Sequence, residues 1–415
     1  MQDAKHAFIN RQFFNLTLFT LIFGVMFYDV ISMLGFSYVD EICAVLMLAL
    51  FGYKVFNTKT WEFNRSFLIV ICVFIFYLIY SMAIQSNTKG AILMDFIIQL
   101  KPYLAFFCVY AVRPVFSENQ KKIIRQLIAL CSIYVLLIGI LGLIDYSFIE
   151  YTLGHYSRVA TASSILALLY LYCSDYTKTD KLIFVLILAI GILSTRSKHF
   201  GFFIICALLV FYLNRSFTIK LNLKNLFFIV AALALVVLVA WNKIYYYFVT
   251  GGFGSGRSAD DLYARMALYY FSILILRDYF PFGSGFASYA TYASGESYST
   301  IYAKYGMSGM HGLTKAAPDF IADTYYPALA QFGYVGLVLF FLFWFNLLKK
   351  AVGMFNKGFI KESLIAILII LFFLIECTSD ATITHNRGMF MMMLMGLVFS
   401  DLKNKNLCPH EPTIS

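Results

Sequence analysis

Apolar residues in this chain gather into long runs that short polar stretches separate. Most runs approach the length of about 20 residues that an α-helix needs to cross a hydrocarbon core about 30 Å thick. Twelve segments fit: 16–34, 38–56, 66–84, 91–112, 123–144, 157–173, 181–194, 198–213, 224–241, 326–347, 363–379 and 385–400. The strands of a β-barrel would instead alternate polar and apolar residues. The pattern therefore predicts an all-α polytopic membrane protein with about 12 transmembrane helices.

Composition supports this fold class. Of the 415 residues, 61% are hydrophobic and 13% are charged, whereas an ordinary soluble domain has about 45–50% and about 25%. A water-soluble fold is excluded. The eight cysteines form no CxxC pair, so we expect small buried hydrophobic side chains and no metal site. No A-x-A-like cleavage site follows the first apolar run, which predicts a retained helix.

The net charge of +10 reflects an uneven distribution of basic residues among the loops. With a cytoplasmic N-terminus, 20 of the 32 basic residues lie in the two tails and in the loops on the cytoplasmic side. The positive-inside rule favours this orientation, which places both termini in the cytoplasm. It also explains most of the net charge, so no nucleic-acid partner is expected.

The chain divides into four parts, because one connection between predicted helices is much longer than the others. Residues 1–241 contain predicted helices 1–9, residues 242–325 form a large outer loop, residues 326–400 contain helices 10–12, and residues 401–415 form a cytoplasmic tail. A loop of this length is usually functional. Ser258 and Asp261 fit a capping box, and apolar residues follow at helical spacing until Pro281. We expect an amphipathic helix there, at the outer membrane boundary.

Arginine is distributed differently from lysine. Fifteen of 21 lysines are cytoplasmic in this topology, but only five of 11 arginines are. Because the planar guanidinium group can bind phosphate through two parallel hydrogen bonds, the outer arginines indicate a phosphate or diphosphate ligand. Interfacial anchoring is the alternative explanation. The candidate ligand-binding cations are Lys101, Arg158, Arg196, Lys198, Arg277 and Arg387.

Lys101 differs from the others because it lies in the middle of an apolar run, next to Pro102. A lysine at the centre of a membrane helix costs about 2.5–3.5 kcal/mol on insertion scales unless it faces a polar interior. Pro102 is expected to kink the helix. The alternative to ligand binding is that Lys101 snorkels or pairs with Asp95.

The outer loop contains the candidate groups for proton transfer. His311 and Asp323 are the principal ones, and Asp323 stands where the predicted tenth helix begins, close to Tyr325. Tyrosine is abundant in this loop, and its ring and hydroxyl suit both sugar binding and interfacial anchoring. Tyr325 is the tyrosine that we assign to ligand binding. We find no nucleotide-binding loop, and we expect no cofactor.

Two sequence stretches resemble the bacterial Wzy-type O-antigen or capsule repeat-unit polymerases and the related O-antigen ligases. They are RDYFPFGSGF from Arg277 to Phe286, which follows Arg265, and DTYYPALAQFGYVG from Asp323 to Gly336. The resemblance extends to twelve helices with one large loop before the tenth. It implies a periplasmic glycosyl transfer in the bacterial inner membrane, with an undecaprenyl-diphosphate-linked oligosaccharide as substrate. It also implies roles for Arg158, Arg196 and Arg265 in binding the diphosphate, with Arg265 in the catalytic set.

The ligases usually carry His-Asn where this chain has Asp323 and Thr324, and His311 lies a dozen residues away. This difference favours a polymerase that joins lipid-linked repeat units. Two alternatives stay open: a ligase that transfers finished polymer to a lipid A core, and a lipid-linked sugar flippase or other transporter. Expected partners of a polymerase are membrane lipid, a chain-length regulator and a flippase.

Overall fold

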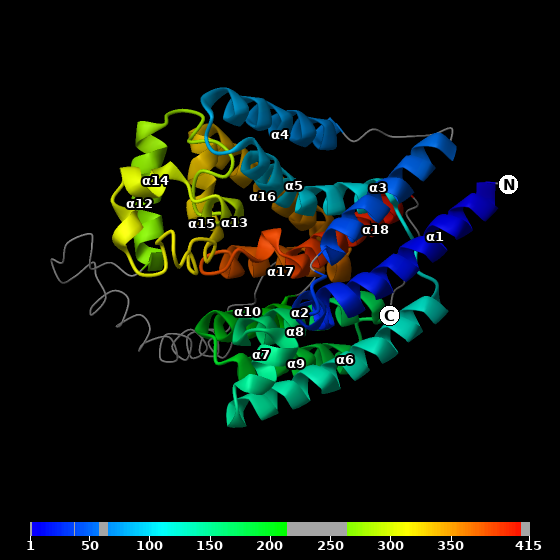
Figure 1. The fold of residues 1–415 in the computed structure, drawn as a ribbon. Coiled ribbons are helices and arrows are strands. Elements are labelled where there is room, and N and C mark those ends of the chain that lie inside the picture. Colours follow the sequence, from blue (N-terminus) through cyan, green and yellow to red (C-terminus); the bar gives the residue numbers. More distant parts are fainter. Residues whose placement is uncertain (1, 37, 58–64, 214–263, 408–415) are drawn as a thin grey trace, which may run out of the picture.

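The computed structural model describes residues 2–36, 38–57, 65–213 and 264–407 (Figure 1). These residues form helices and no strand. The first half of the chain contains α1 (Gln2–Phe19), the π-helix η1 (Thr20–Met26), α2 (Tyr28–Met33), α3 (Val39–Asn57), α4 (Arg65–Ile84), α5 (Lys89–Val112), α6 (Glu118–Ile144), α7 (Ser147–Leu153), α8 (Tyr156–Cys173), α9 (Lys178–Ile190), η2 (Gly191–Ser194) and α10 (Ser197–Tyr212).

The second half contains α12 (Ala264–Asp278), α13 (Tyr292–Glu296), α14 (Thr300–Lys304), η5 (Met307–Gly309), α15 (Tyr325–Ala328), η6 (Leu329–Phe332), α16 (Gly333–Asn356), α17 (Ile360–Glu376), η7 (Thr382–Thr384) and α18 (Asn386–Leu407). Eleven of the predicted apolar segments fall on these helical residues, and two of them, 16–34 and 326–347, each run over three successive elements. The remaining one, 224–241, and the predicted capping box at Ser258 lie outside the described residues.

Five helical stretches among the described residues are long and apolar enough to cross a membrane: Lys5–Met26, Arg65–Ile84, Lys89–Val112, Glu118–Ile144 and Tyr325–Asn356. The all-α membrane fold predicted from the sequence is therefore confirmed at this coarser level.

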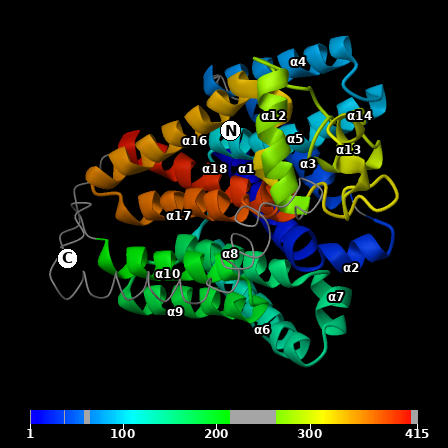
Figure 2. The same cartoon turned by 90° about the vertical axis from the view of Figure 1, so that its left-hand side faces the viewer.

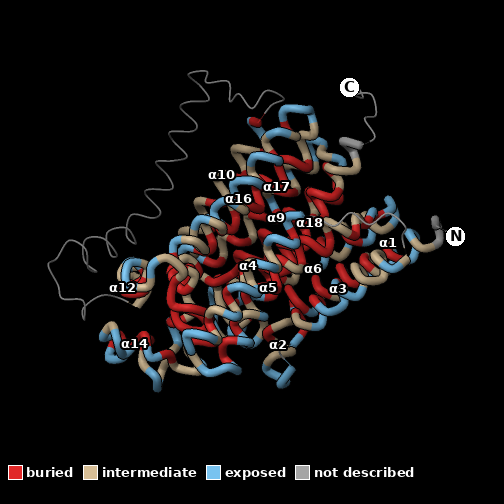
Figure 3. Tube along the Cα trace, turned by 90° about the horizontal axis from the view of Figure 1, so that it is seen from above, coloured by how far each residue is buried: buried red, intermediate tan, exposed pale blue. Residues whose placement is uncertain are grey.

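Helix α18 forms the centre of the molecule. Every residue from 386 to 400 is buried, and the helix packs against α5, α17 and α8. Gly396 allows the closest approach, because an added Cβ would lie 2.6 Å from the backbone oxygen of Phe106 on α5. Small residues commonly permit such contacts between membrane helices. Two views place α6 and α8–α10 on one side of α17 and α18, with α4, α5 and α16 on the other (Figures 1 and 2), and buried residues line the inner sides of these layers (Figure 3).

The start of α1 and the end of α18 lie at the same end of this bundle, here named the terminal end. Lys5 donates to Asn57 at the end of α3 over 3.2 Å, and Tyr172 at the end of α8 donates to Asp401 over 2.7 Å. Phe116, before α6, contacts Phe13 on α1 and the ring of Tyr172. The opposite end, named the loop end, carries residues 264–332.

The loop residues fold into a compact unit around their own core. Apolar residues of α12, among them Leu268 and Phe271, pack with the fully buried Tyr289 and Tyr302. Helix α12 ends before Pro281, as predicted, and contacts α15 and η6. Asn87, between α4 and α5, holds the unit in place by donating to the carbonyl oxygens of Ala287 and Ser297, each over 2.7 Å.

Candidate functional site

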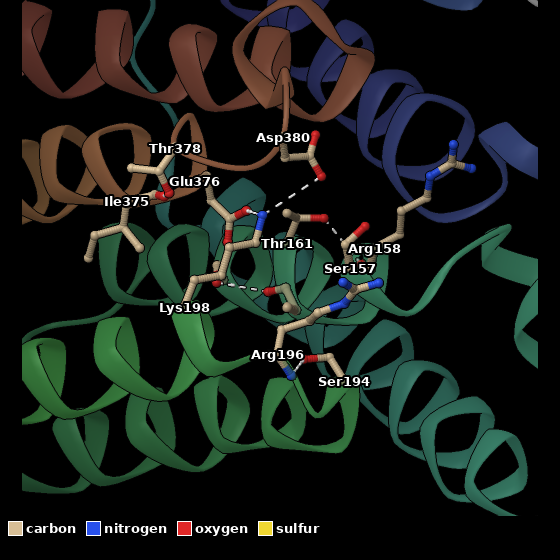
Figure 4. A network of polar contacts seen from close by, with 12 residues as sticks. Ser157, Arg158, Thr161, Ser194, Arg196, Lys198, Ile375, Glu376, Thr378 and Asp380 are labelled. Carbon is tan, nitrogen blue, oxygen red and sulfur yellow. Dashed lines mark hydrogen bonds and ion pairs between the residues drawn. The ribbon is translucent and has the colours of Figure 1, made fainter. Parts of the chain in front are cut away.

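Three helices begin close together at the loop end, and each carries a cation in its first turn; Figure 4 shows two of the three, Arg158 and Lys198. These residues are Arg158 on α8, Lys198 on α10 and Arg387 on α18. The amino end of a helix already has a positive potential that favours acidic residues and disfavours cations. Cations at three such ends therefore add to the positive potential instead of balancing it. Together with Arg196 and Arg265 they are named the basic cluster.

Three carboxylates connect the helices of the basic cluster. Asp29 on α2 pairs with Arg158 and, over 2.9 Å, with Nη2 of Arg387. Glu376, at the end of α17, lies 2.6 Å from Nζ of Lys198, and Asp380 lies 3.9 Å from the same atom. The contacts of Asp29 join α2, α8 and α18, and those of Glu376 and Asp380 hold α10 against the end of α17. The two groups are neighbours, since Arg158 acts on the charge of Asp380.

Arg265 joins the cluster from the loop unit. Its Nε donates to Oδ2 of Asp323 over 2.7 Å, and its Nη2 lies 2.5 Å from the same oxygen. Burial raises the pKa of Asp323 above its ordinary value, although Arg265 acts in the opposite direction. Arg196 also acts on the charge of Asp323. The structure thus brings together Arg265 and Asp323, which lie 58 residues apart in the sequence.

Arg196 has a neutral partner instead of a carboxylate. Its Nη2 lies 2.8 Å from Nε2 of His155, the residue directly before α8. Burial lowers the pKa of His155 to about 4, and Arg196 and Arg158 contribute to the same shift. His155 is therefore uncharged at neutral pH, and its Nε2 accepts a hydrogen bond from the guanidinium group.

His385 and Asp380 are further members of the site that the sequence did not identify. Both lie in the connection between α17 and α18. His385 is exposed and stands directly before the first turn of α18. Burial opposes ionisation of Asp380, but Lys198 and His385 lower the pKa of this carboxyl overall. The only available sequence signal was that His385 stands two residues before Arg387.

Four predicted site residues have other surroundings. Lys101 pairs with Asp40 and, over 3.0 Å, with Glu41 on α3. Asp95, the alternative partner suggested by the sequence, instead accepts from the backbone N–H of Ala287 over 2.7 Å.

Arg277 lies at the opposite end of α12 from Arg265, exposed, and contacts its neighbour Asp278 over 3.0 Å. His311 is exposed and its ring packs edge-on against Phe320. Tyr325 is buried in the main core, and its N–H lies 3.3 Å from the carbonyl oxygen of Cys377, next to Glu376. Within the described residues, no group of three His, Cys, Asp or Glu side chains is arranged to hold a metal ion.

No protein-family model matches the chain, and no curated protein matches it. The basic cluster is thus characterised by its geometry alone.

Proposed function

We propose that this protein is a membrane glycosyltransferase that joins oligosaccharide repeat units carried on undecaprenyl diphosphate, as the O-antigen polymerases do. The observation that carries the proposal is the convergence of Arg158, Lys198 and Arg387, each in the first turn of a helix, with Arg196 beside them. Helix amino ends and guanidinium groups are both typical of phosphate-binding sites. A diphosphate is the ligand that matches this concentration of positive charge.

Two arginine side chains of the basic cluster have donor groups that could still bind an anion. Arg196 makes no ion pair with a carboxylate of the described chain, since its partner is His155. Arg387 is 4% exposed, and its Nε has no hydrogen-bond partner among the described residues. A buried donor without an acceptor is uncommon and calls for an explanation. A bound diphosphate oxygen would supply that acceptor.

The proposed reaction uses the lipid diphosphate as leaving group. A sugar hydroxyl of one lipid-linked unit attacks the anomeric carbon of the sugar on a second lipid. A new C–O bond forms, the bond from that carbon to the diphosphate oxygen breaks, and the diphosphate leaves with the electron pair. Positive groups that the folded protein already holds in position stabilise the negative charge that develops on the leaving oxygen. The arginines of the basic cluster have this role.

Asp323 is the residue that we assign as proton acceptor for the attacking hydroxyl. Arg265 holds its Oδ2, which leaves Oδ1 to receive the proton. Burial raises the pKa of Asp323, and a raised pKa makes a carboxylate a stronger base. His311, the alternative base suggested by the sequence, lies on the loop against Phe320.

The membrane topology belongs to the same proposal. We propose about 12 spans in the bacterial inner membrane, with the loop end in the periplasm and both termini in the cytoplasm. Basic side chains outside the basic cluster support this orientation. Lys121, Lys181 and Lys361 lie in the first turns of their helices, and Lys349 lies in the second half of α16, all toward the terminal end. Cytoplasmic loops are enriched in such residues. A chain-length regulator and a flippase are the protein partners that this activity would require.

The test is polymerisation by the purified full-length protein, with undecaprenyl-diphosphate-linked repeat units as the only sugar source. We expect Arg196→Gln to lower kcat/KM by about 100-fold, the scale on which removal of one charge-stabilising donor acts. Arg277→Gln is the matched control, because Arg277 pairs with its neighbour outside the basic cluster. Polymer formed at the wild-type rate by Arg196→Gln would contradict the proposal. A product with single transfers to lipid A core and no ladder would favour a ligase.

A further inference from the structure

A second feature lies apart from the basic cluster, between α4, α5 and α16. The structure has a cavity of about 300 Å³ there, lined mainly by apolar and aromatic side chains. Its floor includes Phe106 and Phe107 of α5 and Phe340 of α16, all buried. Its rims are Ile69 of α4 and Leu342 of α16, which are 50% and 47% exposed. The cavity is therefore a groove that opens between α4 and α16, at the edge of the molecule where α4 lies (Figure 1).

Aromatic side chains close the groove toward the loop end. The hydroxyl of Tyr77 donates to the carbonyl oxygen of Phe332 over 2.6 Å. The ring of Phe332 lies 5.2 Å from that of Tyr77 and 5.0 Å from that of Phe286. All three residues line the groove. A hydrocarbon chain in the groove would thus end against these packed rings, two of which, Phe286 and Phe332, belong to the loop unit.

The other end of the groove is basic. Lys350, in the second half of α16, lines the groove and is exposed. Arg65, the first described residue of α4, is also exposed and lines an adjoining apolar cavity of about 410 Å³ between α4 and α16. The two cations face the terminal end, where an anionic headgroup at the membrane surface would meet them.

The length of the groove suits one acyl chain. Along α4 it extends from Ser66 to Tyr77, and along α16 from Gly336 to Lys350. At 1.5 Å per helical residue these stretches span roughly 16–21 Å. Half of a hydrocarbon core about 30 Å thick is about 15 Å, so a chain anchored at the basic end would reach the aromatic closure near the middle of the bilayer.

We propose that this groove binds one acyl chain of an anionic phospholipid from the leaflet at the terminal end, with its phosphate at Arg65 and Lys350. The proposal is independent of the glycosyltransferase activity. The tail of a lipid held at the basic cluster is a different occupant, and the closure by Tyr77, Phe286 and Phe332 argues against it.

Native mass spectrometry of the delipidated full-length protein tests the charged end. We expect phosphatidylglycerol to bind more tightly than phosphatidylcholine with the same acyl chains. Removing one basic charge near a membrane surface costs about 1 kcal/mol, or roughly fivefold in affinity, so the double variant Arg65→Gln/Lys350→Gln should remove most of this preference. Lys349→Gln makes the same change at a neighbouring exposed lysine and should leave the preference unchanged. An unchanged preference in the double variant overturns the proposal.

Two bulky variants test the apolar part. Val70→Trp and Leu339→Trp fill the groove from opposite walls, and each should lower phosphatidylglycerol binding at least tenfold. Val338→Trp is the control, since Val338 is exposed on α16 and does not line the groove. A thermal unfolding curve shows whether each variant is folded. Wild-type binding by both folded groove variants, or displacement of phosphatidylglycerol by polyprenyl phosphate at lower concentration, would show a different occupant or site.

Discussion

Arg196 differs from Lys198 and Arg387 because its partner, His155, is not a carboxylate. Lys198 and Arg387 each face a carboxylate within 3 Å, whereas Arg196 faces an imidazole. A neutral histidine can orient the guanidinium group by accepting a hydrogen bond, and it removes none of its charge. We therefore expect His155 to act as a positioning residue for Arg196.

The lowered pKa of His155 predicts a pH dependence of stability. The folded protein keeps this side chain neutral down to a pKa of about 4, while the ordinary value is 6.5. Between these values the unfolded chain binds more protons, so stability is full above pH 6.5 and falls as the pH decreases toward 4. We expect protonation of His155 to lower the free energy of unfolding by about 1–2 kcal/mol over this pH range, after allowance for solvent screening of a half-buried side chain.

The measurement is the unfolding temperature of the purified protein in detergent at pH 7 and pH 4.5. His155→Gln should lose less stability than the wild type over this interval, because it has no proton to gain. His311→Gln, a change at an exposed histidine, should retain the wild-type dependence. Equal losses in His155→Gln and the wild type would show that His155 is already protonated in the fold.

At the residue scale, the sequence identified the cations of the basic cluster but not the residues that pair with them. Arg158, Arg196, Lys198, Arg265 and Arg387 could be selected because outer arginines and lysines are few. Their partners come from other parts of the chain: Asp29 is 129 residues from Arg158 and 358 from Arg387. The same holds for Lys101, whose partner Asp40 is 61 residues away. Without an alignment, nothing in one sequence pairs residues at such separations.

Among the elements, the turn after α12 shows how closely the loop unit meets the membrane helices. Gly283 has φ of +82°, and an added Cβ would lie 2.2 Å from the backbone nitrogen of Gly333 at the start of α16. Gly333 is packed in the same way against the carbonyl oxygen of Pro281. Two backbone segments therefore touch directly, and a side chain at either glycine would separate them.

Gly283→Ala should destabilise the protein through two effects. Positive φ costs an alanine about 1–2 kcal/mol, and the backbone contact adds strain of about 1–3 kcal/mol. Gly306→Ala is the matched control, because Gly306 has φ of +73° and open space around it. We expect the unfolding temperature to fall clearly more in Gly283→Ala than in Gly306→Ala. Similar decreases would mean that the segments around Gly283 and Gly333 separate easily.

Helix positions could be predicted from hydrophobic runs, and helix limits came partly from capping residues. The predicted segment 123–144 begins at Glu118 in the structure, because Ser117 and Gln120 form a capping box around a polar first turn.

The loop unit was harder to predict. Its tyrosines suggested sugar binding or interfacial anchoring, yet Tyr289 and Tyr302 are fully buried. Composition alone does not distinguish a surface aromatic residue from one that forms a small core.

On the scale of the whole molecule, basic side chains gather at both ends, but their surroundings differ. The terminal end carries exposed lysines, as at Lys349 and Lys350. The loop end carries the basic cluster, in which cations from α8, α10 and α18 are held by carboxylates. Exposed lysines are sufficient to orient a membrane protein, whereas cations gathered at helix amino ends favour a bound anion.

The orientation predicted from this division can be tested in intact cells. In a cysteine-free variant, Tyr292→Cys places a thiol on the exposed side of α13 at the loop end, and Lys349→Cys places one at the terminal end. A membrane-impermeant maleimide added outside, after the outer membrane is permeabilised, should label position 292 and leave position 349 unlabelled. Disrupting the inner membrane should make both reactive, which controls for thiol accessibility. Labelling at position 349 in intact cells would place the terminal end outside, and the basic cluster would then lie on the cytoplasmic side, away from any periplasmic lipid-linked sugar.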